Sequence, residues 1–307
     1  MANADYDVLI IGSGPAGLTA GLYCSRAKLK TVIIEKANLG GNIINAEVVE
    51  NFPGFPQGIS GAELSSNMIS QVLGYGVELK QSEVTSIGLI GGFKEITATD
   101  GQYLAKAVIV AGGGRRKKLG VPGEDEFVGK GISFCAMCDG NRFAGKAVAV
   151  IGGGDGGLSE GLYLAKLASK VTIIEIDSKL HASAVLQEKA RVNPKVDILS
   201  STTVEEISGD TEVKSIVIKN VETGSKSNLQ VSGVLFAIGL EPEVEYLQGM
   251  LELDSDGYIV VTRLMETNVP GIFAAGDIRS ESVRQAVAAA GDGAVAAVSA
   301  ENFIRRM

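Results

Sequence analysis

The chain has 307 residues, a formal net charge of −8 and a hydrophobic share of 45%. This length allows about two domains, and the composition is that of a globular protein with sizeable cores. The acidic balance excludes a nucleic-acid-binding protein, because neutralising phosphates requires a basic face. No apolar run reaches the about 18 residues of a membrane-spanning helix, so we expect no membrane segment.

The beginning of the chain and its cysteine content indicate where the protein works. The first residues, MANADYDVLIIG, lack the charged region and cleavage site of a signal peptide. Three cysteines leave one unpaired and do not form a disulfide framework. We therefore expect a cytoplasmic protein, in which a close Cys pair is redox-active or metal-binding.

The first pattern in chain order is a strand, a glycine-rich turn, a helix and a second strand over residues 10–35. Gly12 allows the tight turn, Gly14 lets a pyrophosphate approach the backbone, and Gly17 lets the helix pack closely on the sheet. The helix N-terminus then offers N–H groups to the phosphate. Glu35 ends the second strand, where its carboxylate can accept ribose hydroxyls. The segment predicts a dinucleotide site.

The same pattern returns at residues 150–175, without a gap. Twelve of the 26 aligned positions are identical, including the three glycines, now Gly152, Gly154 and Gly157, and the terminal acid, Glu175. One such element binds one dinucleotide, so two of them indicate two redox partners meeting in one protein.

The organisation predicted for the chain is one domain inserted into another. Two polar stretches with Pro or Gly, at 116–125 and 241–250, read as linkers. We predict a first domain formed by residues 1–115 and 246–307, and an inserted domain formed by residues 116–245, because the tail is too short to fold alone.

Both domains alternate strand and helix patterns. The tail itself contains the apolar stretch IFAAGDI at 272–278 and a small-residue helix from about 282 to 304. The fold class is therefore α/β, with two Rossmann-like domains built on largely parallel sheets.

A Cys-x-x-Cys pair, Cys135 and Cys138, stands before the second glycine turn. A structural zinc site needs four ligands, and Cys24 and His181 are the only other cysteine and histidine, so we predict no metal site. Two free buried thiols are a second alternative. The favoured interpretation is a reversible disulfide, in which one thiolate attacks a substrate disulfide and the other resolves the mixed disulfide. Asp139 is the neighbouring acid that can protonate the departing thiolate, while Cys24 fills core space.

The dithiol segment SFCAMCDG at 133–140 resembles the S-x-C-A-T-C-D-G site of low-molecular-weight thioredoxin reductases, with Met137 replacing Thr. Further segments match in family order over nearly the whole chain. They are GSGPAGLTAGLY, the Gly pair at 40–41, EVVENFPGFP, AGGGRRKKLGVPGE and GIFAAGDIRSESVRQAV.

This resemblance implies an FAD-containing homodimer whose inserted domain rotates to present the dithiol to the flavin and then to thioredoxin. It implies that Cys138 faces the flavin, that Cys135 attacks the protein disulfide, and that Asp277 contacts the ribityl or pyrophosphate part. A helix start near Arg284 would stabilise negative charge on the reduced flavin. The residues implied for FAD are Gly12, Gly14, Pro15, Ala16, Gly17, Glu35, Lys36, Gly41, Asn42, Asn51, Val84, Ala111, Gly112, Gly276, Asp277, Arg284, Gln285 and Ala286.

The chain departs from the family at its second nucleotide site. The segment EIDSKLH at 175–181 places Glu, Ile, Asp and His where the family has His, Arg, Arg and Arg. The turn is GGGDGG in place of GGGDSA. Losing the arginines removes the clamps for the 2′-phosphate of NADPH and adds repulsion. We predict that NADPH is an inefficient donor, and that electrons come from NADH, for which Glu175 suits a free 2′-hydroxyl, or from ferredoxin.

Three functions remain open at the level of the sequence. The first is an FAD-dependent disulfide reductase acting on thioredoxin. The second is an NADH-dependent flavoenzyme whose dithiol serves a peroxidase-type partner. The third is a non-catalytic flavin redox sensor, against which the intact Cys-x-x-Cys-Asp motif argues.

Overall fold

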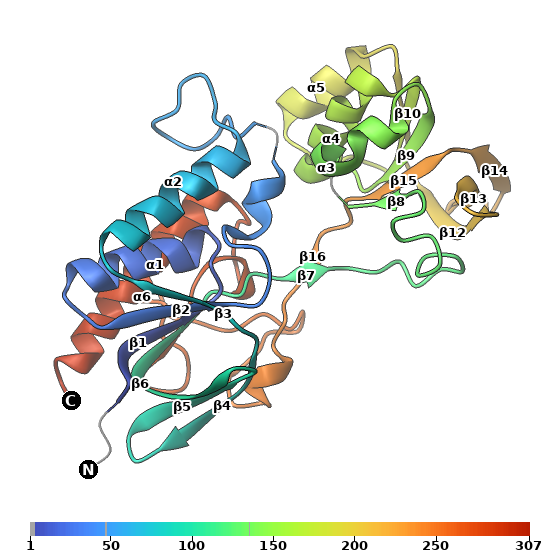
Figure 1. Ribbon diagram of the computed structural model, residues 1–307. Coiled ribbons are helices and arrows are strands. Elements are labelled where there is room, and N and C mark those ends of the chain that lie inside the picture. Colours follow the sequence, from blue (N-terminus) through green and yellow to red (C-terminus); the bar gives the residue numbers. More distant parts are fainter. Residues whose placement is uncertain (1–3, 47, 135) are drawn as a thin grey trace. The chain divides into compact units, whose positions relative to one another are not determined.

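The computed structural model describes residues 4–46, 48–134 and 136–307, and it gives no side-chain description for residues 45, 116, 138 and 240. The chain forms two compact units: a first unit of residues 1–115 and 241–307, and an inserted unit of residues 116–240 (Figure 1). The predicted α/β class with parallel sheets is confirmed.

The first unit is built on a seven-stranded sheet in the order β3-β2-β1-β6-β5-β4, with β17 pairing β6. Its strands are β1 (Tyr6–Ile11), β2 (Thr31–Glu35), β3 (Glu78–Gln81), β4 (Val84–Ile90), β5 (Phe93–Ala98), β6 (Gly101–Val110) and β17 (Ile272–Ala274). Strands β1, β2, β3, β6 and β17 run parallel, whereas β4 and β5 continue the sheet from β6 as antiparallel strands.

Three helices lie side by side against this sheet (Figure 1). They are α1 (Pro15–Arg26), α2 (Gly61–Gly74) and α6 (Ala286–Ile304), and the short 3₁₀ turns are η1 (Gly41–Asn45), η3 (Glu245–Leu247) and η4 (Gly276–Ile278). Helix α6 approaches α1 closely, since a Cβ on Gly293 would lie 2.1 Å from the carbonyl oxygen of Ala16. The Ala- and Gly-rich sequence of α6 follows from this contact.

The helix α6 begins at Ala286, four residues after the position that the sequence predicted. Arg284 has a φ of 53°, in the left-handed region, and Gln285 is extended. Neither residue continues a right-handed helix, so the chain enters α6 only after them.

The inserted unit contains a parallel five-stranded sheet in the order β11-β10-β9-β15-β8 and an antiparallel three-stranded sheet in the order β12-β13-β14. Its strands are β8 (Ile132–Ser133), β9 (Ala147–Ile151), β10 (Lys170–Ile174), β11 (Val196–Leu199), β12 (Thr202–Gly209), β13 (Val213–Asn220), β14 (Lys226–Gln230) and β15 (Gly233–Phe236). Its helices are α3 (Ala136–Asp139), η2 (Gly140–Phe143), α4 (Asp155–Leu167) and α5 (Ala184–Val192).

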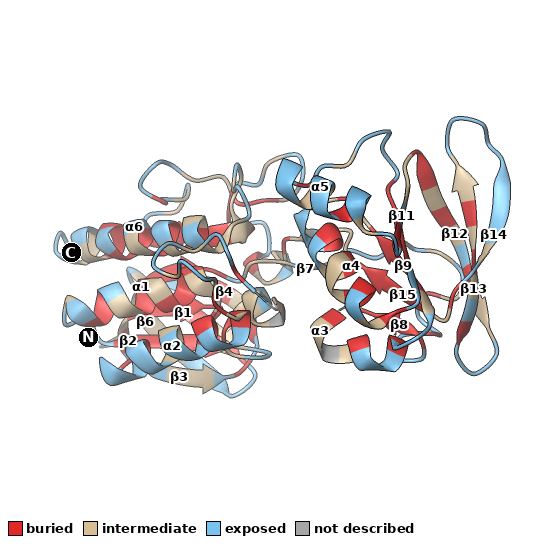
Figure 2. Cartoon of the chain, turned by 90° about the horizontal axis from the view of Figure 1, so that it is seen from above, coloured by how far each residue is buried: buried red, intermediate tan, exposed pale blue. Residues whose placement is uncertain are grey.

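The burial pattern explains why these segments form parallel sheets. Along β1, Val8 and Ile10 enter one apolar cluster while Leu9 enters another on the opposite face. Strands β9, β10 and β15 are likewise almost wholly buried, whereas β14 is exposed (Figure 2). A strand covered on both faces is apolar throughout, which is the pattern read from the sequence.

The chain crosses between the units at β7 (Arg115–Arg116) and β16 (Leu240–Glu241). The first boundary coincides with the prediction, but the second lies five residues earlier than the predicted end of the inserted domain. The reason is packing, because Leu247 and Leu251 are buried in an apolar cluster of the first unit. Glu241 and Glu245 also pair with Arg115 of that unit, both at 2.7 Å. Within the described ranges, no helix is long and apolar enough to span a bilayer.

Candidate functional site

The glycine turn between β1 and α1 makes a cradle of backbone. Gly12 has a φ of 100°, and a Cβ there would lie 2.4 Å from the carbonyl oxygen of Ala111. A Cβ on Gly17 would lie 1.9 Å from the carbonyl oxygen of Gly12, so both positions require glycine. At Gly14 the nearest atom to such a Cβ is the Cα of Gly41, at 3.9 Å. The cradle is therefore closed behind and open where a phosphate would approach.

The first turn of α1 follows directly. Pro15 begins the helix and Ala16 is buried behind it, and Gly14 at the N-cap provides no side-chain hydrogen bond. The N–H groups of this turn are left to a ligand, and the positive end of the helix dipole favours an anion there.

Glu35 is held beside this turn by three hydrogen bonds. Its Oε2 accepts the backbone N–H of Ser13 at 2.8 Å and the Ser13 hydroxyl at 2.9 Å, and its Oε1 accepts the N–H of Ala37 at 2.9 Å. These bonds fix the carboxylate while lone pairs remain for ribose hydroxyls. Ser13, fully buried, is a supporting residue that the fingerprint does not specify.

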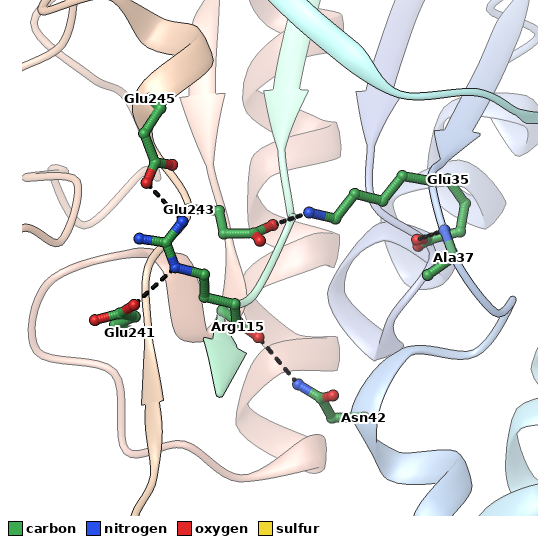
Figure 3. A network of polar contacts seen from close by, with 9 residues as sticks. Glu35, Ala37, Asn42, Arg115, Glu241, Glu243 and Glu245 are labelled. Atoms are coloured by element: carbon green, nitrogen blue, oxygen red, sulfur yellow. Dashed lines mark hydrogen bonds and ion pairs between the residues drawn. The ribbon is translucent and has the colours of Figure 1, made fainter. Parts of the chain in front are cut away.

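The chain crossings border the same end of the first unit (Figure 3). Lys36 pairs with Glu243, and Asn42 donates from Nδ2 to the carbonyl oxygen of Gly114 at 3.4 Å. Lys36 is therefore balanced by a carboxylate at an exposed position, where such a pair contributes little to stability.

The predicted residues Val84, Ala111 and Gly112 lie where β4 begins and β6 ends, and Val84 and Ala111 are buried. Next to them is a residue that the sequence did not indicate, Tyr246. Its hydroxyl is buried and has no hydrogen-bond partner among the described residues, and it lies 3.7 Å from the place of a Cβ on Gly112. A buried unpaired hydroxyl is rare and fits a polar ligand atom beside it.

The second half of this site comes from the tail of the chain. Asp277, in η4, accepts the hydroxyl of Ser282 at 3.2 Å, and burial raises the pKa of its carboxyl above the usual range. The preceding Gly276 donates its N–H to Asp292 at 3.2 Å. Asp292 also forms a bidentate ion pair with Arg279, at 2.6 and 3.1 Å. This pair fixes the turn that carries Asp277.

Asn51 and Gln285, far apart in the sequence, meet at the start of α6. The Nδ2 of Asn51 donates to Oε1 of Gln285 at 2.8 Å. Arg284 donates to the hydroxyl of Tyr258 at 2.8 Å, and Ala286 opens the 19-residue helix. The structure thus places every residue predicted for FAD in the first unit, around a glycine cradle, a fixed carboxylate and a helix N-terminus. This set fits FAD.

The inserted unit repeats the glycine turn in the same geometry. Gly152 has a φ of 114°, and a Cβ on Gly157 would lie 1.9 Å from the carbonyl oxygen of Gly152, as in the first turn. A Cβ on Gly156 would meet no atom within 4 Å. The departures at Gly156 and Gly157 therefore leave the shape of a nucleotide-binding turn unchanged.

The acid that follows this turn is also held as in the first unit. Glu175, which is 6% exposed, accepts the N–H of Gly153 at 2.6 Å on Oε2 and the N–H of Asp177 at 3.0 Å on Oε1. Asp177 pairs with His181 at 2.8 Å, and both side chains are exposed. At the three positions where the resembling family has arginines, this chain has Ile176, Asp177 and His181, and the carboxylate of Asp177 pairs with His181.

The dithiol lies in the inserted unit. Cys135 and the side chain of Cys138 are outside the described part of the structure, although the backbone of Cys138 belongs to α3. Asp139 ends α3, and its Oδ2 accepts the hydroxyl of the buried Ser133 at 2.6 Å. Cys24 is 1% exposed and burial raises the pKa of its thiol to about 12, so its predicted role as core filler is confirmed.

Comparisons with known proteins show the family of the chain. The family model described as pyridine nucleotide-disulphide oxidoreductase matches residues 6–293. Thioredoxin reductase from Bacillus subtilis is 44% identical over 303 residues, which are 98% of this chain and 96% of that protein. The crystal structure of Lactococcus lactis thioredoxin reductase has a TM-score of 0.96 at 39% identity, covering 99% of this chain and all of the other.

A second kind of relative is structurally more distant. A ferredoxin-flavin thioredoxin reductase from Clostridium acetobutylicum is 31% identical, with a TM-score of 0.54, and the match covers 98% of this chain and 99% of the other. The glycine cradle, the fixed Glu35 and the full-length matches together assign the chain to the pyridine nucleotide-disulphide oxidoreductase family, in which it belongs with the FAD-dependent thioredoxin reductases.

Proposed function

We propose that the chain reduces the disulfide of thioredoxin or a similar small dithiol protein through Cys135 and Cys138, with electrons supplied by NADH or reduced ferredoxin rather than NADPH. The observation that carries the acceptor side is Asp139, which the fold fixes at the end of α3 directly after the Cys pair. The arrangement supplies an acid for disulfide exchange, which a sensor that only binds flavin would not need.

The chemistry of the dithiol is an exchange in which atoms and electrons balance. The thiolate of Cys135 attacks one sulfur of the partner's disulfide, the partner's S–S bond breaks, and the departing sulfur takes a proton from Asp139. Cys138 then passes its thiol proton to the ionised Asp139, and its thiolate attacks Cys135, forms the Cys135–Cys138 disulfide and breaks the bond to the second partner sulfur. That sulfur takes up from water the proton that Cys135 released when it became a thiolate. Two protons and two electrons pass from the enzyme's thiols to the partner's thiols. Bound FAD supplies the two-electron reduction that regenerates the dithiol.

Residues of the first unit would hold that FAD. Gly12, Gly14 and Gly17 provide the pyrophosphate cradle, and Glu35 accepts the adenosine ribose. Asp277 would accept a hydroxyl at the ribityl end, where its raised pKa reflects a carboxylate removed from water. The N-terminus of α6 would stabilise negative charge at the flavin.

The donor is proposed from the second nucleotide site. The intact turn at Gly152 and the fixed Glu175 suit a ribose with a free 2′-hydroxyl, as in NADH. The exposed Asp177 would face the 2′-phosphate of NADPH, which carries about two negative charges. Each lost charge-assisted contact is worth about 1.5–3 kcal/mol, so the missing arginines weaken NADPH binding by several orders of magnitude. Ferredoxin is the donor named for the Clostridium acetobutylicum relative, and it needs no nucleotide site.

We also propose that two copies assemble through the outer face of α1 and α6. A groove there is lined by Tyr23, Leu264, Val295 and Val298, which are 45%, 56%, 36% and 47% exposed. Glu266, Asn302 and Arg306 also line the groove. Exposed apolar side chains gathered in this way and bordered by polar residues are typical of a protein–protein interface. Light scattering should give a dimer for the parent chain and a monomer for Val298→Glu, whereas Val192→Glu, on the exposed side of α5, should stay dimeric. A monomeric parent would rule out this assembly.

The experiment for the acceptor traps the exchange halfway. Cys138→Ser, reduced and mixed with oxidised thioredoxin from Bacillus subtilis, should form a mixed disulfide that survives non-reducing electrophoresis, because the resolving thiol is missing. The double variant Cys135→Ser/Cys138→Ser retains only the buried Cys24 and should trap nothing. If the single variant also fails to trap its partner, or if it turns over like the parent, the proposed exchange is wrong.

A further inference from the structure

The hydroxyl of Ser133 donates a hydrogen bond to the carboxylate of Asp139, and these two residues flank the Cys-x-x-Cys pair in the sequence. Ser133 stands two residues before Cys135, and Asp139 follows Cys138 directly. Their side chains meet at 2.6 Å, Oγ to Oδ2, across the intervening segment. The bond therefore joins the two ends of the Cys-x-x-Cys loop.

The two partners differ in how firmly the fold holds them. Ser133 is 2% exposed and belongs to β8, where it lies opposite Leu235 of the parallel neighbour β15. Asp139 is partly exposed and ends a helix of four residues, too short to be stable by itself. Ser133 is thus the anchored partner, and the hydrogen bond transmits the rigidity of the sheet to the acid.

The geometry also distinguishes the two oxygens of Asp139. A carboxylate accepts a hydroxyl strongly at a distance of 2.6 Å, and a serine hydroxyl has a single proton to donate. While Oδ2 accepts that proton, the acidic proton of Asp139 is carried by Oδ1. The bond thereby selects the oxygen that exchanges a proton with sulfur and fixes the plane of the carboxyl group.

We propose that Ser133 is a positioning residue for disulfide exchange, acting through Asp139 by holding Oδ2 so that Oδ1 delivers the proton to the departing sulfur. This inference rests on the acid role proposed above for Asp139. It extends that role to a buried residue of β8.

The test is a single-turnover reaction of the reduced enzyme with oxidised thioredoxin. The enzyme is the FAD-loaded chain, reduced with dithiothreitol and desalted without oxygen, so that no electron donor is involved. The chain contains no tryptophan, and the fluorescence of a tryptophan-containing thioredoxin therefore reports the exchange without background. Four variants are compared: Ser133→Ala, Ser133→Thr, Asp139→Asn and the double variant Ser133→Ala/Asp139→Asn.

A positioning role predicts a specific pattern among these rates. Ser133→Ala should slow the exchange about 10- to 100-fold, the range for losing a hydrogen bond to a charged group. The thioredoxin concentration at half-saturation should stay constant. Ser133→Thr retains the hydroxyl and should recover most of the rate. In the Asp139→Asn background, Ser133→Ala should have no further effect, because the residue through which it acts has lost its acid.

The outcomes separate the inference from the function on which it rests. If Asp139→Asn slows exchange but Ser133→Ala does not, the inference is overturned and the proposed function stands. If Ser133→Ala slows exchange equally in both backgrounds, the serine has only a structural role and the inference is again overturned. If Asp139→Asn exchanges at the parental rate, the acid role itself fails. Thermal unfolding of each variant shows whether a slow rate reflects a misfolded protein.

Discussion

The carboxylate of Glu175 accepts the backbone N–H of Gly153 at 2.6 Å, which is the bond that Glu35 makes to Ser13 at 2.8 Å in the other unit. In both units the second carboxylate oxygen accepts the N–H two residues further on. The segment that is repeated in the sequence therefore forms the same structure twice, a carboxylate that backbone N–H groups hold in place to accept ribose hydroxyls. The two copies differ in what surrounds this acceptor.

The matched acids give the first prediction. Glu35→Gln should weaken FAD binding about 10- to 100-fold, because an amide replaces the charged acceptor of the ribose hydroxyls. Glu175→Gln makes the same change in the inserted unit and should leave the FAD content at the parental level. Flavin absorbance after dialysis measures both. Equal retention of FAD by the two variants would contradict the assignment of the first unit as the flavin site.

The second prediction concerns the ion pair beneath Asp277. Asp292→Asn leaves Arg279 with its charge unpaired in a site where the two side chains are only 16% and 11% exposed. Breaking such a pair costs about 3–5 kcal/mol, and the turn that carries Asp277 should loosen with it. Urea unfolding should show this loss in the apoprotein. Glu301→Gln breaks the exposed pair with Arg305 on the same helix and should cost about 0.5 kcal/mol or less. Equal losses of unfolding free energy in the two variants would show that the buried pair stabilises the fold no more than the exposed pair does.

The third prediction is a pH dependence of stability that comes from Lys94. This lysine is 3% exposed, its ammonium lies 4.6 Å from the ring centroid of Phe303, and burial lowers its pKa below 10.5. The amine of Lys94 therefore binds its proton more tightly in the unfolded chain, where its pKa is 10.5, than in the folded chain. Stability contributed by Lys94 rises as the pH increases from the folded pKa toward 10.5.

Urea midpoints between about pH 8 and about pH 10.5 test this sign, and the comparison with a variant that lacks Lys94 cancels the titration of the tyrosines. The difference in stability between the parent and Lys94→Met should shift in favour of the parent as the pH rises. Lys179→Met, which removes an exposed lysine, should track the parent throughout. Parallel curves for Lys94→Met and the parent would contradict the buried position of this amine.

The sequence predicted the architecture because its strongest signals are local. The two glycine turns, the strand that each follows and the acid at the end of each second strand are all set by steric and hydrogen-bonding demands within 26 residues. The predicted start of α6 was wrong by four residues, because the left-handed backbone conformation of Arg284 cannot be recognised from the sequence pattern of a helix. The predicted second boundary was displaced because Leu247 and Leu251 are buried against strands of the first unit that lie more than 100 positions earlier in the sequence.

The supporting residues of the sites were less accessible to sequence reasoning. Ser133 stands within the dithiol motif, but only the fold shows that its hydroxyl reaches Asp139. Asp292 was not predicted, although it is an acid within a helix rich in alanine and glycine, which is unusual. Nothing in the neighbouring sequence shows that Arg279 is its partner. The buried hydroxyl of Tyr246 depends on the packing of the 3₁₀ turn η3 against β4, for which no sequence pattern exists.

The fourth prediction reverses the donor preference. Replacing Ile176, Asp177 and His181 together by arginine removes one carboxylate and restores three cations at the positions where the family carries them. All three of these side chains already stand at exposed positions, so the change should be tolerated. The half-saturating concentration of NADPH should fall by at least about 100-fold, as two restored charge-assisted contacts predict. An unchanged value would show that the segment does not contact the 2′-phosphate.

The most direct measurement is the bleaching of the flavin band in the FAD-loaded parent chain, without oxygen, after addition of NADPH, NADH or reduced ferredoxin. EDTA is included, because Glu175, Asp177 and His181 offer ligand atoms within 4.8 Å of one another and could otherwise take up a divalent cation. We predict that micromolar NADPH leaves the band unchanged, while NADH or reduced ferredoxin bleaches it within the time of one turnover. Fast bleaching by micromolar NADPH would contradict the account, because it would show that a site that lacks the three arginines and carries Asp177 accepts the 2′-phosphate.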